Sequence, residues 1–222
     1  MRLIFCCFMA MIMTLGVNAQ KHYTFESGQL GAEWQYVGEP DQSKYCFAEG
    51  KLRLIGSVFE LFEEQPATFT GLAANDKDFV AETKLTYFDT ESGDEAGLCL
   101  FASHNGYVQC CVNTYQGGRR LRVQLRLLSH QFQIAEKHVS SGAKVWLRVR
   151  SEGPKLKFYY STDGKDFHWM EDVERRLLGA DIVGGDGRLL VGMYSHMHNT
   201  KFQSGYSFAD FEYFDYQEGL PK

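Results

Sequence analysis

The stretch RRLRVQLRLLS, residues 119–129, alternates between polar and apolar side chains. From 121 to 127 its odd-numbered positions hold Leu, Val, Leu and Leu, and from 120 to 126 its even-numbered positions hold Arg, Arg, Gln and Arg. A period of two is typical of a β-strand that buries one face and exposes the other. The stretch therefore predicts an antiparallel strand with an apolar inner side and a basic outer side.

The same period recurs along the chain. It is present in three further segments, FVAETKLTYF at 79–88, KVWLRVR at 144–150 and KLKFYYS at 155–161. Turn residues separate such segments, as in His104-Asn105-Gly106 and Gln116-Gly117-Gly118, because glycine and asparagine adopt positive φ at little cost. The one helical candidate, Val173 to Leu178, is a turn or two long. Without a linker or an internal repeat, these strands predict one all-β domain, a sandwich or a closed barrel.

The C-terminal stretch YSFADFEYFDY, residues 206–216, has no cleanly polar side. A strand between a core and a covering loop would give this pattern. A strand with a β-bulge would give it too, and the bulge would bring Phe211 and Phe214 onto the same face. We interpret the stretch as a closing core strand rather than as a platform on which a ligand stacks.

Composition narrows the class of protein. Of 222 residues, 44% are hydrophobic and 23% are charged, which is typical of a folded soluble domain. The net charge is −5 and no long basic run is present, so nucleic acid is not an expected partner.

The N-terminus predicts export. Arg2 precedes an apolar run from Leu3 to Val17, and Val17-Asn18-Ala19 resembles a signal-peptidase site. We expect residues 1–19 to be a removed signal peptide, because the run is short for a transmembrane anchor. Residues 20–222 then form a single β-sandwich domain in the periplasm or outside the cell. The mature chain has no N-x-S/T sequon, which suits a bacterial protein.

The mature chain has four cysteines, at positions 46, 99, 110 and 111. Their spacing is that of neither a disulfide scaffold nor paired metal ligands. We interpret them as small buried residues of strands. A bridge from Cys99 to Cys110 or Cys111 stays open as an alternative.

Several segments together resemble a known family. They are FESGQLGAEWQYVGEP at 25–40, KLRLIG at 51–56, EAGLCLF at 95–101, VWLRVRSEGPKLKFYYSTDGKDFHWM at 145–170, GRLLVGMYS at 187–195 and FADFEYFDY at 208–216. Their order resembles the C-terminal domain of family 43 glycoside hydrolases, the β-xylosidase and arabinofuranosidase group. The resemblance implies a concanavalin A-like jelly-roll β-sandwich of antiparallel strands.

The resemblance also carries expectations about function. The family's catalytic carboxylates lie on a separate N-terminal five-bladed propeller, for which this chain has no room. A loop of the family's sandwich can close one side of that active site, and segment 63–79 falls where this loop is expected. The resemblance thus implies an association with glycans, and no catalysis by itself.

A binding face is the first candidate site, because aromatic rings stack on sugars and arginine bonds their hydroxyl or carboxylate groups. The polar sides of the predicted strands and nearby turns supply the candidates Arg120, Arg122, Arg126, Trp146, Arg148, Tyr159, Tyr107, Trp169, Tyr194 and His196. A solvated sheet face with a covered Trp146 is the alternative.

Catalytic candidates are the acids Asp210 and Glu212, which are two residues apart and therefore share a strand face. Glycoside hydrolysis needs two carboxylates on opposite sides of a bond. A structural role is the preferred interpretation of this pair. The denser group Asp89, Glu91, Asp94 and Glu95 is interpreted as a solvated hairpin loop.

For metals, Glu26 and Asp210 are the candidate ligands of a structural calcium ion, since calcium prefers carboxylate and carbonyl oxygens. His196 and His198 could bind a transition metal if a third ligand were supplied, but they are interpreted as surface histidines. No cofactor is required.

These expectations lead to three hypotheses. The first is an exported accessory module that binds polysaccharide of the xylan or arabinan type, alone or with a glycoside hydrolase partner. The second is a small glycoside hydrolase that uses a carboxylate pair on the concave sheet. The third is a domain that docks a protein partner. The sequence leaves the enzyme question open.

Overall fold

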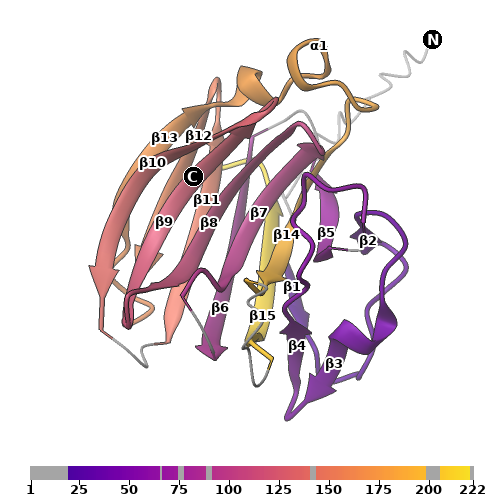
Figure 1. Ribbon diagram of the computed structural model, residues 1–222, viewed down its shortest axis with the longest axis vertical. Helices are drawn as coiled ribbons and strands as arrows, with labels where there is room; N and C mark the ends of the chain where they lie inside the picture. Colours follow the sequence, from indigo (N-terminus) through magenta and orange to yellow (C-terminus); the bar gives the residue numbers. More distant parts are fainter. Residues whose placement is uncertain are drawn as a thin grey trace, which may run out of the picture.

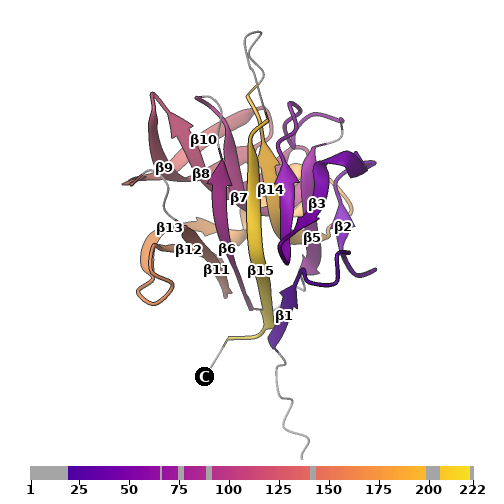
Figure 2. The ribbon, with the colours of Figure 1, turned by 90° about the horizontal axis from the view of Figure 1, so that it is seen from below.

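The computed structural model describes residues 20–65, 67–74, 78–88, 92–140, 144–198 and 206–220. It is a sandwich of two antiparallel sheets, which lie one behind the other in Figure 1 and edge-on in Figure 2. The predicted signal peptide, residues 1–19, lies outside the described residues. Among the described residues, no helix is long and apolar enough to cross a membrane.

Sheet A has eight strands. Their spatial order is β13 (His168–Glu174), β12 (Lys155–Ser161), β11 (Val145–Glu152), β6 (Phe79–Phe88), β15 (Phe208–Glu218), β4 (Lys51–Ile55) and β3 (Tyr45–Ala48). The eighth strand, β1 (Gln20–Thr24), pairs with the C-terminal half of β15, while β4 pairs with its N-terminal part.

Sheet B has seven strands. Their order is β10 (His130–Val139), β9 (Gly118–Leu127), β8 (Gly106–Tyr115), β7 (Glu95–Ser103), β14 (Leu189–His196), β5 (Thr68–Ala74) and β2 (Gln35–Tyr36). The segment 63–79, expected as a loop over an active site, instead contains β5, so that expectation is wrong over residues 68–74.

The main core lies between the sheets, where the apolar sides of the alternating strands meet. Leu121 and Val123 of β9 and Leu147 and Val149 of β11 are each fully buried there. The period-two pattern therefore identified the inner face of each of these strands correctly. Burial of such side chains supplies the main driving force for the sandwich.

β15 confirms the interpretation of the aromatic C-terminal stretch as a core strand. It lies inside sheet A, with β6 on one side and β4 and β1 on the other. A register shift between Phe211 and Tyr213 marks a bulge at Glu212. The bulge turns Phe211 and Phe214 to the same side, where both are fully buried, which is one of the two arrangements that the sequence left open.

The turns follow their residues. Gln116 and Gly117 both have positive φ, at 49° and 76°, in the turn between β8 and β9. The helical candidate Val173–Leu178 is half right: β13 continues to Glu174, and a 3-10 helix, η2, covers Arg175–Leu178. One turn of α-helix, α1 (Ala180–Val183), follows at the upper end of the molecule in Figure 1. A second 3-10 helix, η1 (Gln42–Lys44), precedes β3.

All four cysteines of the described chain are free. The bridge that the sequence left open is therefore not formed. Cys110 faces the core between the sheets, whereas its neighbour Cys111 and Cys99 face outward from sheet B, beneath other residues. All three are fully buried, which confirms the interpretation for them, whereas Cys46 of β3 is only partly buried.

Candidate functional site

The basic and aromatic residues that were expected on one binding face lie on two opposite faces of the sandwich. Arg120, Arg122 and Arg126 point outward from β9 in sheet B, whereas Trp146 and Arg148 point outward from β11 in sheet A. The prediction of a single Arg/Trp face is therefore wrong, because the whole sandwich separates the two groups.

The outer face of sheet A is occupied by its own side chains. Arg148 forms an ion pair with Glu82 at 2.6 Å, and its guanidinium stacks on the ring of Phe167 at 3.4 Å. The Trp146 ring lies against Gly164, where an added Cβ would be 2.7 Å from it, so this indole is covered by the β12–β13 turn. The covered Trp146 that the sequence offered as an alternative is the observed one.

Two further candidates lie on the same side. Tyr159 pairs with Trp169 across β12 and β13, and Trp169 is exposed, with its Nε1 donating to Asp172 at 2.8 Å. A hollow of about 250 Å³ lies farther along this face, beside Arg148 and Arg150. It contains neither tryptophan, so the candidates of sheet A do not gather in one cavity.

The acids Asp210 and Glu212 are both held in ion pairs. Arg53 donates to both oxygens of Asp210, at 2.7 and 2.8 Å, and Lys84 contacts Glu212 at 2.5 Å. Such pairing suits a structural role and leaves neither acid free for general acid or base work.

The same ion pair bears on the calcium prediction. A carboxylate with both oxygens bonded to a guanidinium is a poor cation ligand, and the Glu26 side chain lies beside Gly50. Over the described ranges, no three His, Cys, Asp or Glu side chains come together to hold a metal ion, His196 and His198 included.

The outer face of sheet B is divided by a loop that we call the covering loop, residues 56–65. Leu61 of this loop is buried against Phe69, Phe101 and Tyr107, which form a second hydrophobic cluster outside the sheet. Tyr107 and Tyr194 belong to this cluster and are each 1% exposed, so neither lines the mouth of a groove as predicted.

Hydrogen bonds fix the covering loop. Ser57 forms a bridge with His196, and Met197 N donates to Ser57 O at 2.8 Å. A ring nitrogen of His104 bonds Leu61 O at 2.8 Å, and Glu60 N donates to the Glu63 carboxylate at 2.7 Å. Arg126 stacks on Phe62 of the loop at 4.2 Å, so this arginine supports the cover.

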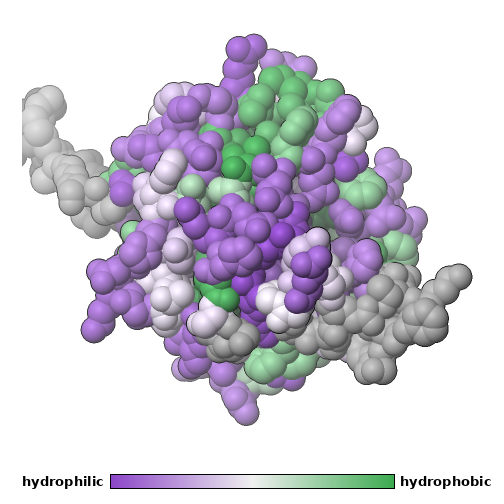
Figure 3. Space-filling model, turned by 60° about the vertical axis from the view of Figure 1, so that its left-hand side comes forward, coloured by the Kyte–Doolittle hydropathy of each residue, from purple (hydrophilic) through white to green (hydrophobic). Residues whose placement is uncertain are grey.

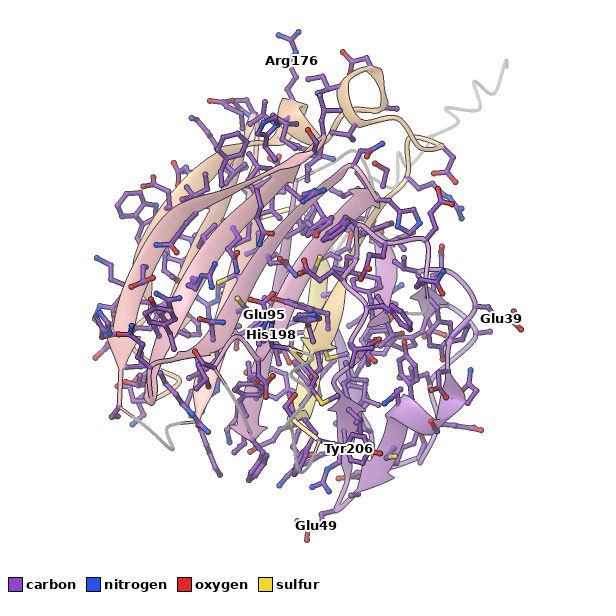
Figure 4. The ribbon with its side chains drawn as sticks, in the orientation of Figure 1. Glu39, Glu49, Glu95, Arg176, His198 and Tyr206 are labelled. Carbon is purple, nitrogen blue, oxygen red and sulfur yellow. The ribbon has the colours of Figure 1, made fainter. Side chains whose placement is uncertain are left out.

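Beyond the covering loop the outer face is open and forms a polar groove of about 350 Å³. We call this the sheet B groove; it is lined by Glu60, Ser92, Gly93, Glu95, Asn113, Tyr115, Arg120, Arg122, Gln124, Gln131, His196 and His198. Figure 4 shows Glu95 and His198 next to each other near the middle of this face. Of the predicted binding residues, the groove brings together Arg120, Arg122 and His196.

A hydrogen-bond network forms the floor of the groove. Gln124 donates from Nε2 to Glu95 Oε2 at 3.0 Å, and Tyr194 donates from its hydroxyl to Glu95 Oε1 at 3.1 Å. The amide oxygen of Gln124 accepts from Arg122 at 2.6 Å and also from Gln131. Each member fixes the next, so the polar surface offered to a ligand is preorganised.

Two arginines lie beside this floor, and they differ in how fully their guanidinium groups are hydrogen-bonded. Arg120 is held by Asn113 at 2.9 Å and by Glu136 at 2.7 Å. The Nε of Arg122 is buried and, within the described residues, has no hydrogen-bond partner. A buried donor of this kind is costly unless a ligand or water accepts from it.

Glu60 enters the groove from the covering loop. Burial raises the pKa of its carboxyl, and the negative charges of Glu95 and Glu63 act in the same direction, while His196 and Arg126 act against it. Glu60 and Glu95 line the same groove, and the charge of Glu95 contributes to the raised pKa of Glu60.

The interpretation of the acidic group at 89–95 as a solvated loop is wrong for its last two members. Asp94 is fully buried and accepts from the backbone N of His198 at 2.7 Å, and Glu95 is 7% exposed on the groove floor. Asp89 and Glu91 lie outside the described residues. Sequence reasoning also missed Glu60 and Gln124. Gln124 could have been found from its position, because it shares the outer side of its strand with the arginines.

Comparison with known proteins identifies the fold. A family model described as "Beta xylosidase C-terminal Concanavalin A-like domain" matches residues 22–217. The solved GH43 BlXynB protein from Bacillus licheniformis is 25% identical, with a TM-score of 0.80 over 89% of this chain and 39% of that one.

Two other solved proteins share the fold at 20% identity. GH43B of the Bacteroides ovatus xyloglucan locus superposes with a TM-score of 0.81, and a xylan β-1,4-xylosidase from Bacillus halodurans with 0.76. Both alignments cover 89% of this chain and 39% of the other. The chain thus spans about two fifths of the length of the solved proteins that it matches.

Proposed function

This chain belongs to the family of β-xylosidase C-terminal concanavalin A-like domains, and on that premise we propose that it binds carbohydrate in the sheet B groove, as an accessory module in polysaccharide degradation. The open polar groove beside the covering loop is the observation that carries the proposal. Xylan- and arabinan-type chains are the first ligands to test, since a solved relative is named as a xylan β-1,4-xylosidase.

The chemistry of the groove suits sugar hydroxyls. Arg122, Gln131 and Asn113 supply donors, Glu95 and Glu60 supply acceptors, and the preorganised floor reduces the entropy lost on binding. Tyr115, which is 47% exposed at the rim and stacked against Arg120 at 4.1 Å, presents an aromatic ring to a sugar face.

Export is part of the proposal, because a polysaccharide-binding module acts outside the cytoplasm. Its support is the sequence of residues 1–19 alone. Mass spectrometry of the secreted protein should give an N-terminus at Gln20. An N-terminus at Met1 would refute this part.

The test of binding is a glycan array probed with residues 20–222, followed by calorimetry on the sugars that bind. Arg122→Ala should weaken binding about tenfold or more, because a hydrogen bond from a charged donor contributes about 1.5–3 kcal/mol. Arg188→Ala is the matched control, since Arg188 is exposed and pairs with Asp186 in a turn outside the groove. Trp146→Ala, on the opposite sheet, should also leave the affinity unchanged.

Two results would refute the proposal. Absence of binding to every sugar on the array would favour a protein partner, such as a glycoside hydrolase. Loss of binding in Trp146→Ala but not in Arg122→Ala would move the site to sheet A. On the side shown in Figure 3, most of the surface is hydrophilic, and hydrophobic groups gather in its upper part.

A further inference from the structure

A row of polar residues crosses sheet B at right angles to its strands. Each member is the direct ladder partner of the next, and the row consists of His196 in β14, Glu95 in β7, Asn113 in β8, Arg120 in β9 and His138 in β10. These five strands lie side by side in this order in Figure 1. Since neighbouring strands are about 4.8 Å apart, the row is about 19 Å long. It is therefore longer than one sugar ring.

The sheet B groove occupies only part of this row. The first four members line the groove, whereas the last two, Arg120 and His138, line a second hollow of about 450 Å³. The other residues of the second hollow are Tyr115, Gln116, Gly118 and Glu136. Because Tyr115 and Arg120 line both spaces, the two spaces meet at this pair. We call them together the extended groove.

Tyr115 is held in place at the junction. The Arg120 guanidinium lies 4.1 Å from the centre of the tyrosine ring, and the side-chain amide of Gln116 donates to the tyrosine hydroxyl at 3.3 Å. Arg120 is itself fixed by Asn113 and Glu136, at 2.9 and 2.7 Å. Tyr115 is nevertheless 47% exposed, so its ring remains open to a ligand. A sugar that stacks on a ring already held in this way costs little side-chain entropy.

The charges of the extended groove largely offset one another. Among the described residues, it is lined by two arginines, at positions 120 and 122, and by three glutamates, at positions 60, 95 and 136. Arg120 is paired with Glu136, so this cation is already neutralised. Because the arginines do not outnumber the carboxyl groups, the groove has no fixed excess of positive charge to attract an anionic chain. Sugar hydroxyls, which both donate and accept, suit this mixture of groups.

We propose that the extended groove binds an uncharged polysaccharide chain over several consecutive sugars, with the chain lying across the strands from β14 to β10 and one ring stacked on Tyr115. The inference rests on the proposed function, because a chain can extend along the groove only if sugar binds there, and it adds the class of ligand. Tyr115 then determines the preference for a chain over a single sugar, since only a ligand that reaches past it contacts the second hollow.

The test is calorimetry of the protein with xylan and arabinan oligosaccharides of increasing length, from the disaccharide to the hexasaccharide. The affinity should rise about tenfold or more along the series that binds, because a ring stacked on an aromatic side chain adds about three- to tenfold by itself. We call this rise the length gain. An oligogalacturonate of equal length supplies an anionic chain for comparison.

Four variants locate the length gain. Tyr115→Ala should remove most of it, and Tyr115→Phe, which keeps the ring, should retain it. Gly118→Leu should also remove it by filling the second hollow; the Gly118 backbone is outside the left-handed region, and an added Cβ would meet only Tyr115 O at 3.6 Å, so the variant should fold. Phe132→Ala is the matched control, because Phe132 is a 45% exposed aromatic of β10 that lines neither hollow.

The outcomes distinguish this inference from the function on which it rests. Equal affinity for the disaccharide and the hexasaccharide would overturn the extended groove and leave carbohydrate binding standing. A length gain that persists in both Tyr115→Ala and Gly118→Leu would overturn the role given to the second hollow. Tighter binding of the oligogalacturonate than of either uncharged hexasaccharide would overturn the charge argument. Absence of binding to any sugar, in these series and on the array, would refute both proposals.

Discussion

Leu61 holds the covering loop to sheet B, and its truncation tests whether this loop organises the groove. The side chain is 3% exposed and packs in the second hydrophobic cluster with Phe69, Phe101 and Tyr107. Leu61→Ala removes three buried carbons, which at about 0.8 kcal/mol each is about 2 kcal/mol, and the cavity adds to this. A loop can partly close over the gap, so we expect a total loss of about 2–3 kcal/mol in the free energy of unfolding.

Urea denaturation of residues 20–222 measures this loss, provided that the m-value is unchanged. Leu128→Ala is the matched control: Leu128 is 48% exposed in the β9–β10 turn, so its truncation should cost less than about 0.5 kcal/mol. Glycan affinity should also fall in Leu61→Ala, because Glu60 is the adjacent residue. A stability loss below about 0.5 kcal/mol would refute the packing argument. A loss of the expected size with unchanged affinity would refute the link between the loop and the groove.

Three other predictions follow from burial and charge. In native protein that begins at residue 20, Ellman's reagent should modify Cys46 alone. Burial raises the pKa of Cys110 to about 12 and raises the pKa values of Cys99 and Cys111 well above normal. Two or more fast-reacting thiols would contradict this prediction. Because the pKa of Glu60 is raised, the folded protein holds this proton more tightly than the unfolded chain, and the ionised carboxylate lowers stability only above about pH 4.5. Glu60→Gln should therefore raise the Tm at pH 7 and not at pH 3. An equal rise at both pH values would refute the argument. Asp210→Asn should lower the free energy of unfolding by about 1–2 kcal/mol, because Arg53 keeps part of its solvation after its partner is lost. EDTA and calcium should leave the Tm unchanged. A calcium-dependent Tm would support a metal at this position.

The strands and their inner faces could be predicted because each depends on local sequence. Alternation fixes which side of β9 or β11 is apolar, and turn residues fix where each hairpin ends. The bulge in β15 was one of two arrangements that the sequence allowed. Phe211 and Phe214 are an odd number of residues apart, and an extra residue lets both reach the core.

The binding face could not be predicted in the same way. Alternation gives the side of a strand that faces outward, but it does not say in which sheet the strand lies. The arginines of β9 and the Trp146 side of β11 have the same pattern, yet they face away from each other because their strands belong to different sheets. That choice depends on pairing between distant segments, such as β11 with β6 and β14 with β7.

Glu95 was missed because the residues that share its side of the strand are apolar or small. The other outward positions of β7 are Gly97, Cys99 and Phe101, which suggest a core strand, since the covering loop buries them from outside. A strand buried on both faces has a nearly continuous apolar sequence. At its end, a single acid resembles the start of a loop, and Glu95 was interpreted as one.

The outward positions nevertheless carry a signal that becomes readable once the strands are paired. In β14 the outward side changes from Leu190 to His196, and in β7, which runs antiparallel to it, from Phe101 to Glu95. His196 and Glu95 are direct partners, so both strands become polar at the same end of the sheet. This change marks where the covering loop stops. The same loop thus buries one half of the face and, through Glu60, brings a carboxyl to the edge of the other, so the position of the groove is set by how far the cover extends.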